Sequence, residues 1–194
     1  MAEQGMNDSG TPIDILKLLA DSDGHGNTLL HLAAQMGDEP RVREILESGT
    51  QVDVSSSEGQ TPLMLAAFQG HPKVVQLLLA HGASVGASDK LGLTPLHWAA
   101  TAMPMTIEVD GAEGYRLANR DRQDWIQVVE MLLANGADTS AQALKGQTPL
   151  YLALRTGNAE IAELLKSRAG TQRIGCTAMP VVLLIRLLAA LMHR

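Results

Sequence analysis

Six histidines and one cysteine are the side chains of this 194-residue chain best suited to metal binding or catalysis. The spacings H-x-x-x-H and H-E-x-x-H, which a zinc site on a helix needs, do not occur in the sequence. The single Cys176 excludes an internal disulfide and a thiolate-rich metal site. The phosphate-binding P-loop is also absent. We therefore expect no catalytic residue, no metal and no cofactor, and we predict that the chain is not an enzyme.

Composition and charge exclude further classes of protein. Hydrophobic residues make up 45% of the chain, enough for a folded core, although aromatic residues contribute only 3%. The net charge of −6 argues against binding to a nucleic acid backbone. Residues 1–10 are polar and acidic, unlike a secretory signal, and a lone cysteine fits a reducing compartment. We expect a cytoplasmic protein, with a nuclear location left open.

A repeat of fixed period organises the chain. The threonine of a G-x-T stretch recurs at Thr28, Thr61, Thr94 and Thr148, so that successive numbers differ by 33, 33 and 54. A hydrophobic position later in each unit recurs at Ile45, Leu78, Leu132 and Leu165, where the differences are 33, 54 and 33. Because 54 equals 33 + 21, the third unit carries an insertion, and the two landmarks together place it at 103–123.

Each unit has the pattern of two helices. A threonine can cap the first helix at its amino end, and proline follows the threonine in three of the four units. The second helix is apolar over most of its surface, as at 74–79, which suits a helix packed between neighbours. Gly49, Gly82 and Gly136 follow the second helices and are predicted to adopt left-handed conformations. Since one helix pair cannot bury its apolar faces alone, the units must stack.

The stretches G-x-T-P-L-H-x-A-A and V-V-x-L-L-L-x-x-G-A, most complete over 59–83, resemble the ankyrin repeat. Four such units in register, over about residues 26–170, make the resemblance specific. It implies an all-α solenoid of stacked helix pairs with short hairpin connections, in which His31 and His97 form structural bonds between adjacent turns. It also implies a non-enzymatic module that binds another protein on a concave face made of the hairpin tips and the first helices.

The predicted organisation has three parts. Residues 1–25 hold a disordered N-terminus and a capping helix, which the apolar pattern places at Pro12–Ala20. The four repeats cover 26–170, and residues 171–194 form a degenerate C-terminal cap helix. The individual repeats are predicted to span 26–58, 59–91, 92–145 and 146–170.

Residues that the repeat pattern does not dictate are the candidates for partner binding. Phe68 stands out because the stacking core does not require an aromatic residue there, and Leu91 and Leu93 flank it in the next hairpin tip. The alternative is that Phe68 folds down between the repeats, while Trp98 and Trp125 are predicted to pack in the core or at its edge. The full set of candidates is Gln35, Met36, Ser57, Glu58, Gln60, Phe68, Gln69, Lys90, Leu91, Leu93, Thr101, Lys145, Arg155 and, from the insertion, Tyr115.

The insertion at 103–123 is a second candidate for partner contact. Apolar and polar residues alternate there around a glycine-rich turn at 110–114, which is compatible with a small β-hairpin. Alternatively, residues 116–123 extend the following helix backwards. A specificity element and a silent loop are both compatible with an insertion of this kind.

The C-terminal residues raise a different set of hypotheses. As a helix, the apolar run Val181–Met192 spans roughly 18 Å, well short of the ~30 Å hydrocarbon core of a bilayer. A membrane-spanning helix is therefore not expected. The run is more apolar than a terminal cap requires, so self-association through Val181–Met192 and an alternative ending are hypotheses beside the cap. The main prediction is a protein-binding module acting as an adaptor or inhibitor, and the alternative is a membrane-associated adaptor that uses residues 180–194.

Overall fold

The computed structural model describes residues 24–101, 105–110, 114–119 and 122–172. The predicted capping helix at Pro12–Ala20 and the predicted helix over 181–192 lie outside these ranges. Within them the chain forms eight helices and one antiparallel pair of strands. The helices, in pairs, are α2 (Leu29–Met36) and α3 (Glu39–Glu47), α4 (Pro62–Gln69) and α5 (Pro72–Ala80), α6 (Pro95–Thr101) and α7 (Arg122–Ala134), and α8 (Pro149–Thr156) and α9 (Ala159–Gln172).

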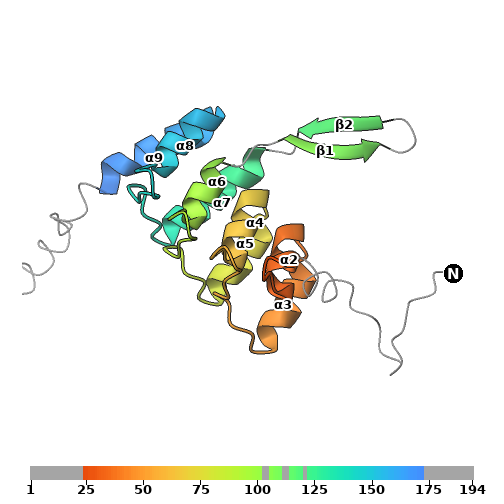
Figure 1. Cartoon of the computed structure of the whole chain (residues 1–194). Helices are drawn as coiled ribbons and strands as arrows, with labels where there is room; N and C mark the ends of the chain where they lie inside the picture. Colours follow the sequence, from red (N-terminus) through yellow and green to blue (C-terminus); the bar gives the residue numbers. More distant parts are fainter. Residues whose placement is uncertain (1–23, 102–104, 111–113, 120–121, 173–194) are drawn as a thin grey trace, which may run out of the picture.

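The helix pairs stack into an elongated solenoid (Figure 1). The first helix of each pair packs on the next first helix, so that α2, α4, α6 and α8 form one layer. The second helices α3, α5, α7 and α9 form the other layer. This arrangement confirms the predicted all-α class of stacked helix pairs, with the strands confined to the segment between α6 and α7.

Threonine and glycine define the ends of the helices, as their positions in the repeat predict. The Thr61 hydroxyl accepts a hydrogen bond from the Met64 backbone nitrogen at 3.4 Å, and Thr148 caps α8 in the same way at 3.2 Å. Each threonine therefore satisfies an amide that the first helical turn leaves without a partner. Glycines with φ of +86°, +85° and +87° follow α3, α5 and α7, as predicted for Gly49, Gly82 and Gly136.

The histidines of the repeat motif tie neighbouring units together, which confirms their predicted structural role. The Thr28 backbone nitrogen donates to His31 Nδ1 at 3.1 Å, so Nε2 carries the proton and donates to the Gln60 carbonyl oxygen at 2.9 Å. His97 repeats this arrangement and reaches the Gln147 carbonyl at 3.0 Å. Both rings are fully buried. Each imidazole thus joins its own helix start to the hairpin tip of the following unit.

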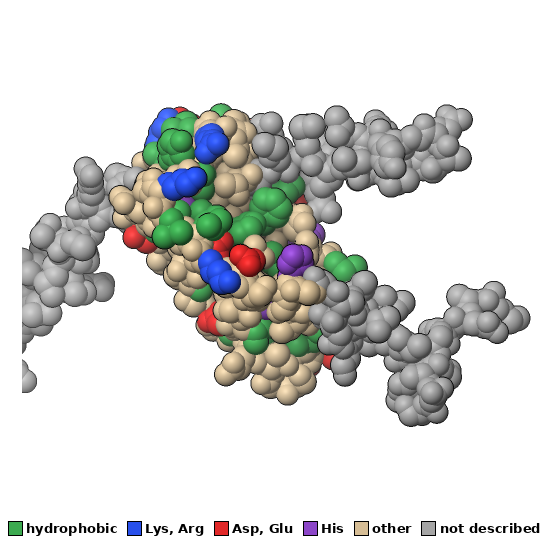
Figure 2. Space-filling view, viewed as in Figure 1, with side chains coloured by type: hydrophobic (Ala, Val, Ile, Leu, Met, Phe, Trp, Pro, Cys, Tyr) green, Lys and Arg blue, Asp and Glu red, His purple; other side chains and the backbone are tan. Residues whose placement is uncertain are grey.

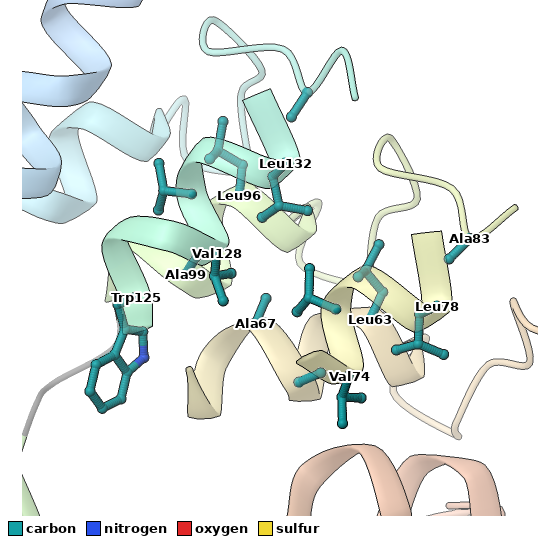
Figure 3. Packing of buried hydrophobic residues seen from close by; sticks show 14 of the residues in the cluster. Leu63, Ala67, Val74, Leu78, Ala83, Leu96, Ala99, Trp125, Val128 and Leu132 are labelled. Atoms are coloured by element: carbon teal, nitrogen blue, oxygen red, sulfur yellow. The ribbon is translucent and has the colours of Figure 1, made fainter. Parts of the chain in front are cut away.

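Small side chains bring the first helices close together in the core (Figure 3). An alanine pair in each of the first three units is fully buried, and leucine and valine from the second helices fill the space behind it. Trp125 of α7 is buried at one edge of this cluster, as predicted. The alanine pairs are Ala33 and Ala34, Ala66 and Ala67, and Ala99 and Ala100.

The segment between α6 and α7 contains a β-hairpin. Strand β1 (Met105–Asp110) pairs antiparallel with β2 (Gly114–Asn119), and the register runs from Met105 opposite Asn119 to Asp110 opposite Gly114. The hairpin projects away from the helical stack (Figure 1). Of the two alternatives for this segment, the structure therefore has the hairpin, and α7 begins only at Arg122.

Candidate functional site

The hairpin tips of successive units form a continuous row along one edge of the stack. The Ser57 nitrogen donates to the His25 carbonyl at 2.9 Å, and the Lys90 nitrogen donates to the Glu58 carbonyl at 3.0 Å. The next link joins the Leu144 nitrogen to the Leu91 carbonyl at 2.9 Å. Backbone hydrogen bonds therefore bring the candidate residues of the tips next to one another across unit boundaries.

Phe68 lies at the end of α4, on the same face as the tips. Its side chain is 36% exposed, so it does not fold down between the repeats. One of its sides contacts Trp98 of α6 in an edge-to-face arrangement, with ring centroids 5.5 Å apart and planes at 90°. This geometry is favourable for two aromatic rings and holds Phe68 in place while part of it stays accessible.

Trp98 and Asp89 belong to this cluster, although the sequence analysis missed both as site residues. The Trp98 indole nitrogen donates to Asp89 Oδ2 at 3.1 Å, and Asp89 Oδ1 accepts from the Leu91 and Leu93 nitrogens, both at 2.9 Å. The buried carboxylate thereby fixes the tip and the indole together. The spacing gives only part of the signal: Trp98 lies three residues before the position equivalent to Phe68, and positions three apart share a helix face, but this does not show that the two rings meet.

Trp125 supports the cluster from the second layer of helices. Its indole nitrogen donates to the Phe68 carbonyl at 2.9 Å. Its ring also covers Gly70, where an added Cβ atom would lie only 2.6 Å from Trp125 Cε2. Gly70 has a φ of +68°, a conformation that glycine adopts readily. Trp125, which follows the β-hairpin in the sequence, thus holds the end of α4 and Phe68 in place.

The exposed apolar side chains of the described residues are unevenly distributed. All six large ones lie on the first helices or on the hairpin tips. Figure 2 shows hydrophobic side chains on the face that carries α4, α6 and α8, with Lys and Arg side chains beside them. The six are Met36, Phe68, Leu91, Leu144, Tyr151 and Leu154.

Two of these six face the end of the described stack rather than the concave surface. Tyr151 occupies the position of His31 and His97, which the following unit buries completely. Leu154 occupies the position of Ala34, Ala67 and Ala100, which are also fully buried. Tyr151 and Leu154 are 49% and 56% exposed because α8 is the last first-layer helix within the described residues.

The remaining candidates differ in what their side chains do. Gln60 and Gln35 contribute backbone carbonyls that accept hydrogen bonds from His31 Nε2 at 2.9 Å and His71 Nε2 at 3.0 Å. The Thr101 hydroxyl donates to the Trp98 carbonyl at 2.9 Å. Tyr115 lies on β2, opposite Val109, in the projecting hairpin and apart from this cluster. Gln69, at the end of α4, is half-buried. Of the remaining candidates, those that lie at the hairpin tips or at the ends of first helices with exposed side chains are Lys145, Arg155, Met36, Ser57 and Glu58.

Two searches of the described part of the chain bear on other kinds of site. Among residues 24–101, 105–110, 114–119 and 122–172, no three His, Cys, Asp or Glu side chains are grouped as metal ligands. No helix in these ranges has the length and hydrophobicity to cross a bilayer.

Comparison with protein families assigns the chain. A family model described as ankyrin repeats (3 copies) matches residues 30–106, and one described as ankyrin repeats (many copies) matches residues 116–165. The chain belongs to the ankyrin-repeat family, whose repeats generally mediate protein–protein interaction. A search of curated proteins finds no match.

Proposed function

We propose that this chain is a non-enzymatic module that binds a partner protein on its concave face, as an adaptor or as an inhibitor of that partner. One observation carries the proposal. Four of the six exposed large apolar side chains of the described residues, Met36, Phe68, Leu91 and Leu144, lie on first helices or hairpin tips away from the end of the stack, and none of the six lies on a second helix. Exposed apolar residues that gather on one face are typical of an interaction site.

The aromatic pair Phe68 and Trp98 is the centre of the proposed contact. Interface residues that contribute most to affinity are large, often aromatic, and held in place before the partner arrives. Asp89 fixes Trp98 by a hydrogen bond of 3.1 Å, and Trp125 fixes the end of α4 by one of 2.9 Å. Little side-chain freedom would therefore be lost on binding. The flanking contacts are Met36 of the first unit and Leu91 of the neighbouring tip.

Affinity capture with mass spectrometry tests the proposal. The wild-type chain is compared with Phe68→Glu and Leu91→Glu, each of which places a carboxylate in the apolar patch. The matched control is Gln76→Glu, which adds the same charge at an exposed position of α5. We expect the two concave-face variants to lose a partner that the wild type and the control retain. If all four chains capture the same proteins, the concave face is not the binding site.

A direct readout is available from the fluorescence of Trp98. Trp125→Phe leaves Trp98 as the one tryptophan of the chain, and its indole lies within the proposed contact. Addition of a captured partner should shift or quench this emission. Emission that stays constant while the partner binds would place the contact elsewhere.

The β-hairpin is proposed as a second contact that selects the partner. The hairpin projects from the stack between α6 and α7. Trp125, the first buried aromatic residue after the hairpin, donates a hydrogen bond to the Phe68 carbonyl at the end of α4. Deletion of 103–123 should therefore weaken or broaden partner capture. Unchanged capture by the shortened chain would remove the hairpin from the mechanism and leave the concave face as the whole site.

A further inference from the structure

The charges of the concave face differ from those of the chain as a whole. The net charge of the protein is −6, yet the first helices α2, α4 and α6 contain no charged residue and α8 contains only Arg155. Acidic residues are found instead on the second helices, as with Glu39, Glu44 and Glu47 of α3. The inner surface is thus apolar toward the first units and cationic at the fourth.

The cations of this surface are only partly neutralised. Lys90 has Glu58 at 3.9 Å, with both side chains more than 60% exposed. Asp89 is buried, and both of its oxygens accept hydrogen bonds, from the backbone nitrogens of Leu91 and Leu93 and from the Trp98 indole. No ion pair within the described residues involves Lys145 or Arg155, which lie at the hairpin tip that precedes α8 and at the end of α8.

From this distribution we infer that the partner presents a segment with a large apolar side chain and, further along, one or more carboxylates. The apolar side chain packs against Phe68, Trp98 and Leu91, and the carboxylates pair with Lys145 and Arg155. The inference rests on the proposed function and adds the chemistry of the partner. Charge complementarity of this kind fixes the direction in which a segment lies and speeds its association.

The repeat geometry also sets the spacing within the partner. Phe68 is on α4 and Arg155 is at the equivalent position of α8, two units further along the stack. Packed helices are about 8–10 Å apart, so two steps cover roughly 16–20 Å. An extended chain advances about 3.3 Å per residue and needs about five or six residues to cover that span. The carboxylates are therefore expected about five or six residues from the apolar anchor.

Selection from a random peptide display library tests this inference on the full-length chain. The wild type is compared with Lys145→Glu/Arg155→Glu and with Phe68→Glu. The matched control, Lys73→Glu/Lys166→Glu, makes the same change of charge on α5 and α9. Circular dichroism verifies that each variant is folded.

The wild type and the control should enrich peptides that carry a large apolar residue and acidic residues at the stated spacing. The double variant Lys145→Glu/Arg155→Glu should keep the apolar preference and lose the acidic one. A synthetic peptide from the wild-type pool should bind this variant about tenfold more weakly, as expected when two exposed ion pairs become repulsive. Added salt should weaken its binding to the wild type.

The outcomes separate this inference from the proposed function. Peptides that depend on Phe68 but show no acidic enrichment, or that bind the double variant as well as the wild type, overturn the inference alone. A wild-type chain that selects no sequence, or whose selected peptides bind Phe68→Glu equally well, contradicts concave-face binding and the inference with it.

Discussion

The indole nitrogen of Trp125 donates a hydrogen bond of 2.9 Å to the backbone carbonyl of Phe68, across 57 positions of the chain. This bond links the two layers of helices, because Trp125 belongs to α7 and Phe68 to α4. It satisfies a carbonyl at the end of a helix, where no partner exists within the helix itself. The residue at the centre of the proposed contact is thus positioned through its backbone by a buried side chain of another unit.

Replacement of Trp125 should separate this hydrogen bond from the packing of the ring. Trp125→Phe keeps an aromatic ring in the core but removes the N–H donor, and should lower the free energy of unfolding by about 1–3 kcal/mol. Trp125→Ala also leaves a cavity and should cost about 3–5 kcal/mol. Urea unfolding followed by circular dichroism measures both. Equal losses in the two variants would mean that the ring contributes little beside the hydrogen bond.

Gly70→Ala should be more damaging than the same change at Gly49. Both glycines have positive φ, +68° and +86°, so alanine is strained at either position. At Gly49 an added Cβ meets nothing within 4 Å, whereas at Gly70 it would lie 2.6 Å from the Trp125 ring. We expect a loss of about 1 kcal/mol for Gly49→Ala, from backbone strain alone. The loss for Gly70→Ala should be larger by a further ~1–3 kcal/mol, which is the cost of overpacking. Thermal unfolding measures both losses. Similar losses for the two variants would show that the Trp125 ring moves aside freely.

The aromatic pair on the concave face should show a measurable coupling. In a double-mutant cycle with Phe68→Ala and Trp98→Ala, the interaction energy should be about 0.5–1.5 kcal/mol, as for other edge-to-face pairs. The matched comparison is Met36→Ala with Trp98→Ala, since Met36 is exposed and belongs to a different unit. Its coupling should be close to zero. A Phe68–Trp98 coupling no larger than this control would contradict a preformed aromatic cluster.

Acid should destabilise the solenoid in part through His97. Burial lowers the pKa of the His97 imidazole below its ordinary value of 6.5, partly opposed by its hydrogen bond to the Gln147 backbone. The unfolded state therefore binds a proton at a higher pH than the folded state does. As pH falls from 6.5 toward the lowered pKa, the free energy of unfolding decreases, and above 6.5 this contribution does not change with pH.

His97→Met provides the test, because the second unit already carries Met64 at the equivalent position. Urea unfolding at pH 7.5 and pH 5.5 should give a smaller loss of stability on acidification for the variant than for the wild type. His25, exposed at a hairpin tip, supplies the control through His25→Gln. Identical pH dependence in the wild type and His97→Met would assign the acid sensitivity to other groups.

The sequence predicts the stack of helices well because the fold repeats the same local contacts. The cap at Thr61, the bond from His31 to the next tip and the left-handed Gly82 each depend on residues within one unit or its neighbour. A single period of the repeat therefore contains the information that positions them. For the insertion at 103–123 the sequence left a β-hairpin and an extension of the following helix as alternatives, because an insertion has no equivalent in the other repeats.

The details of the candidate site are harder to predict from the sequence. Phe68 rests against Trp98 only because adjacent first helices lie close enough for rings in different units to meet. Asp89 looks like an ordinary polar residue of a turn, yet it is buried and bonds to an indole nine positions away. Side-chain directions at the boundary between two units decide both contacts, and spacing alone does not give those directions.

The backbone bonds between hairpin tips separate stability from specificity. The links from Ser57 to His25, Lys90 to Glu58 and Leu144 to Leu91 use only main-chain atoms, so they do not depend on which side chains the tips carry. Most substitutions at these positions therefore alter the surface that a partner meets and leave the joints between units intact. A chain built in this way can acquire a new partner by small steps, because changes that redirect recognition carry little risk of unfolding the scaffold.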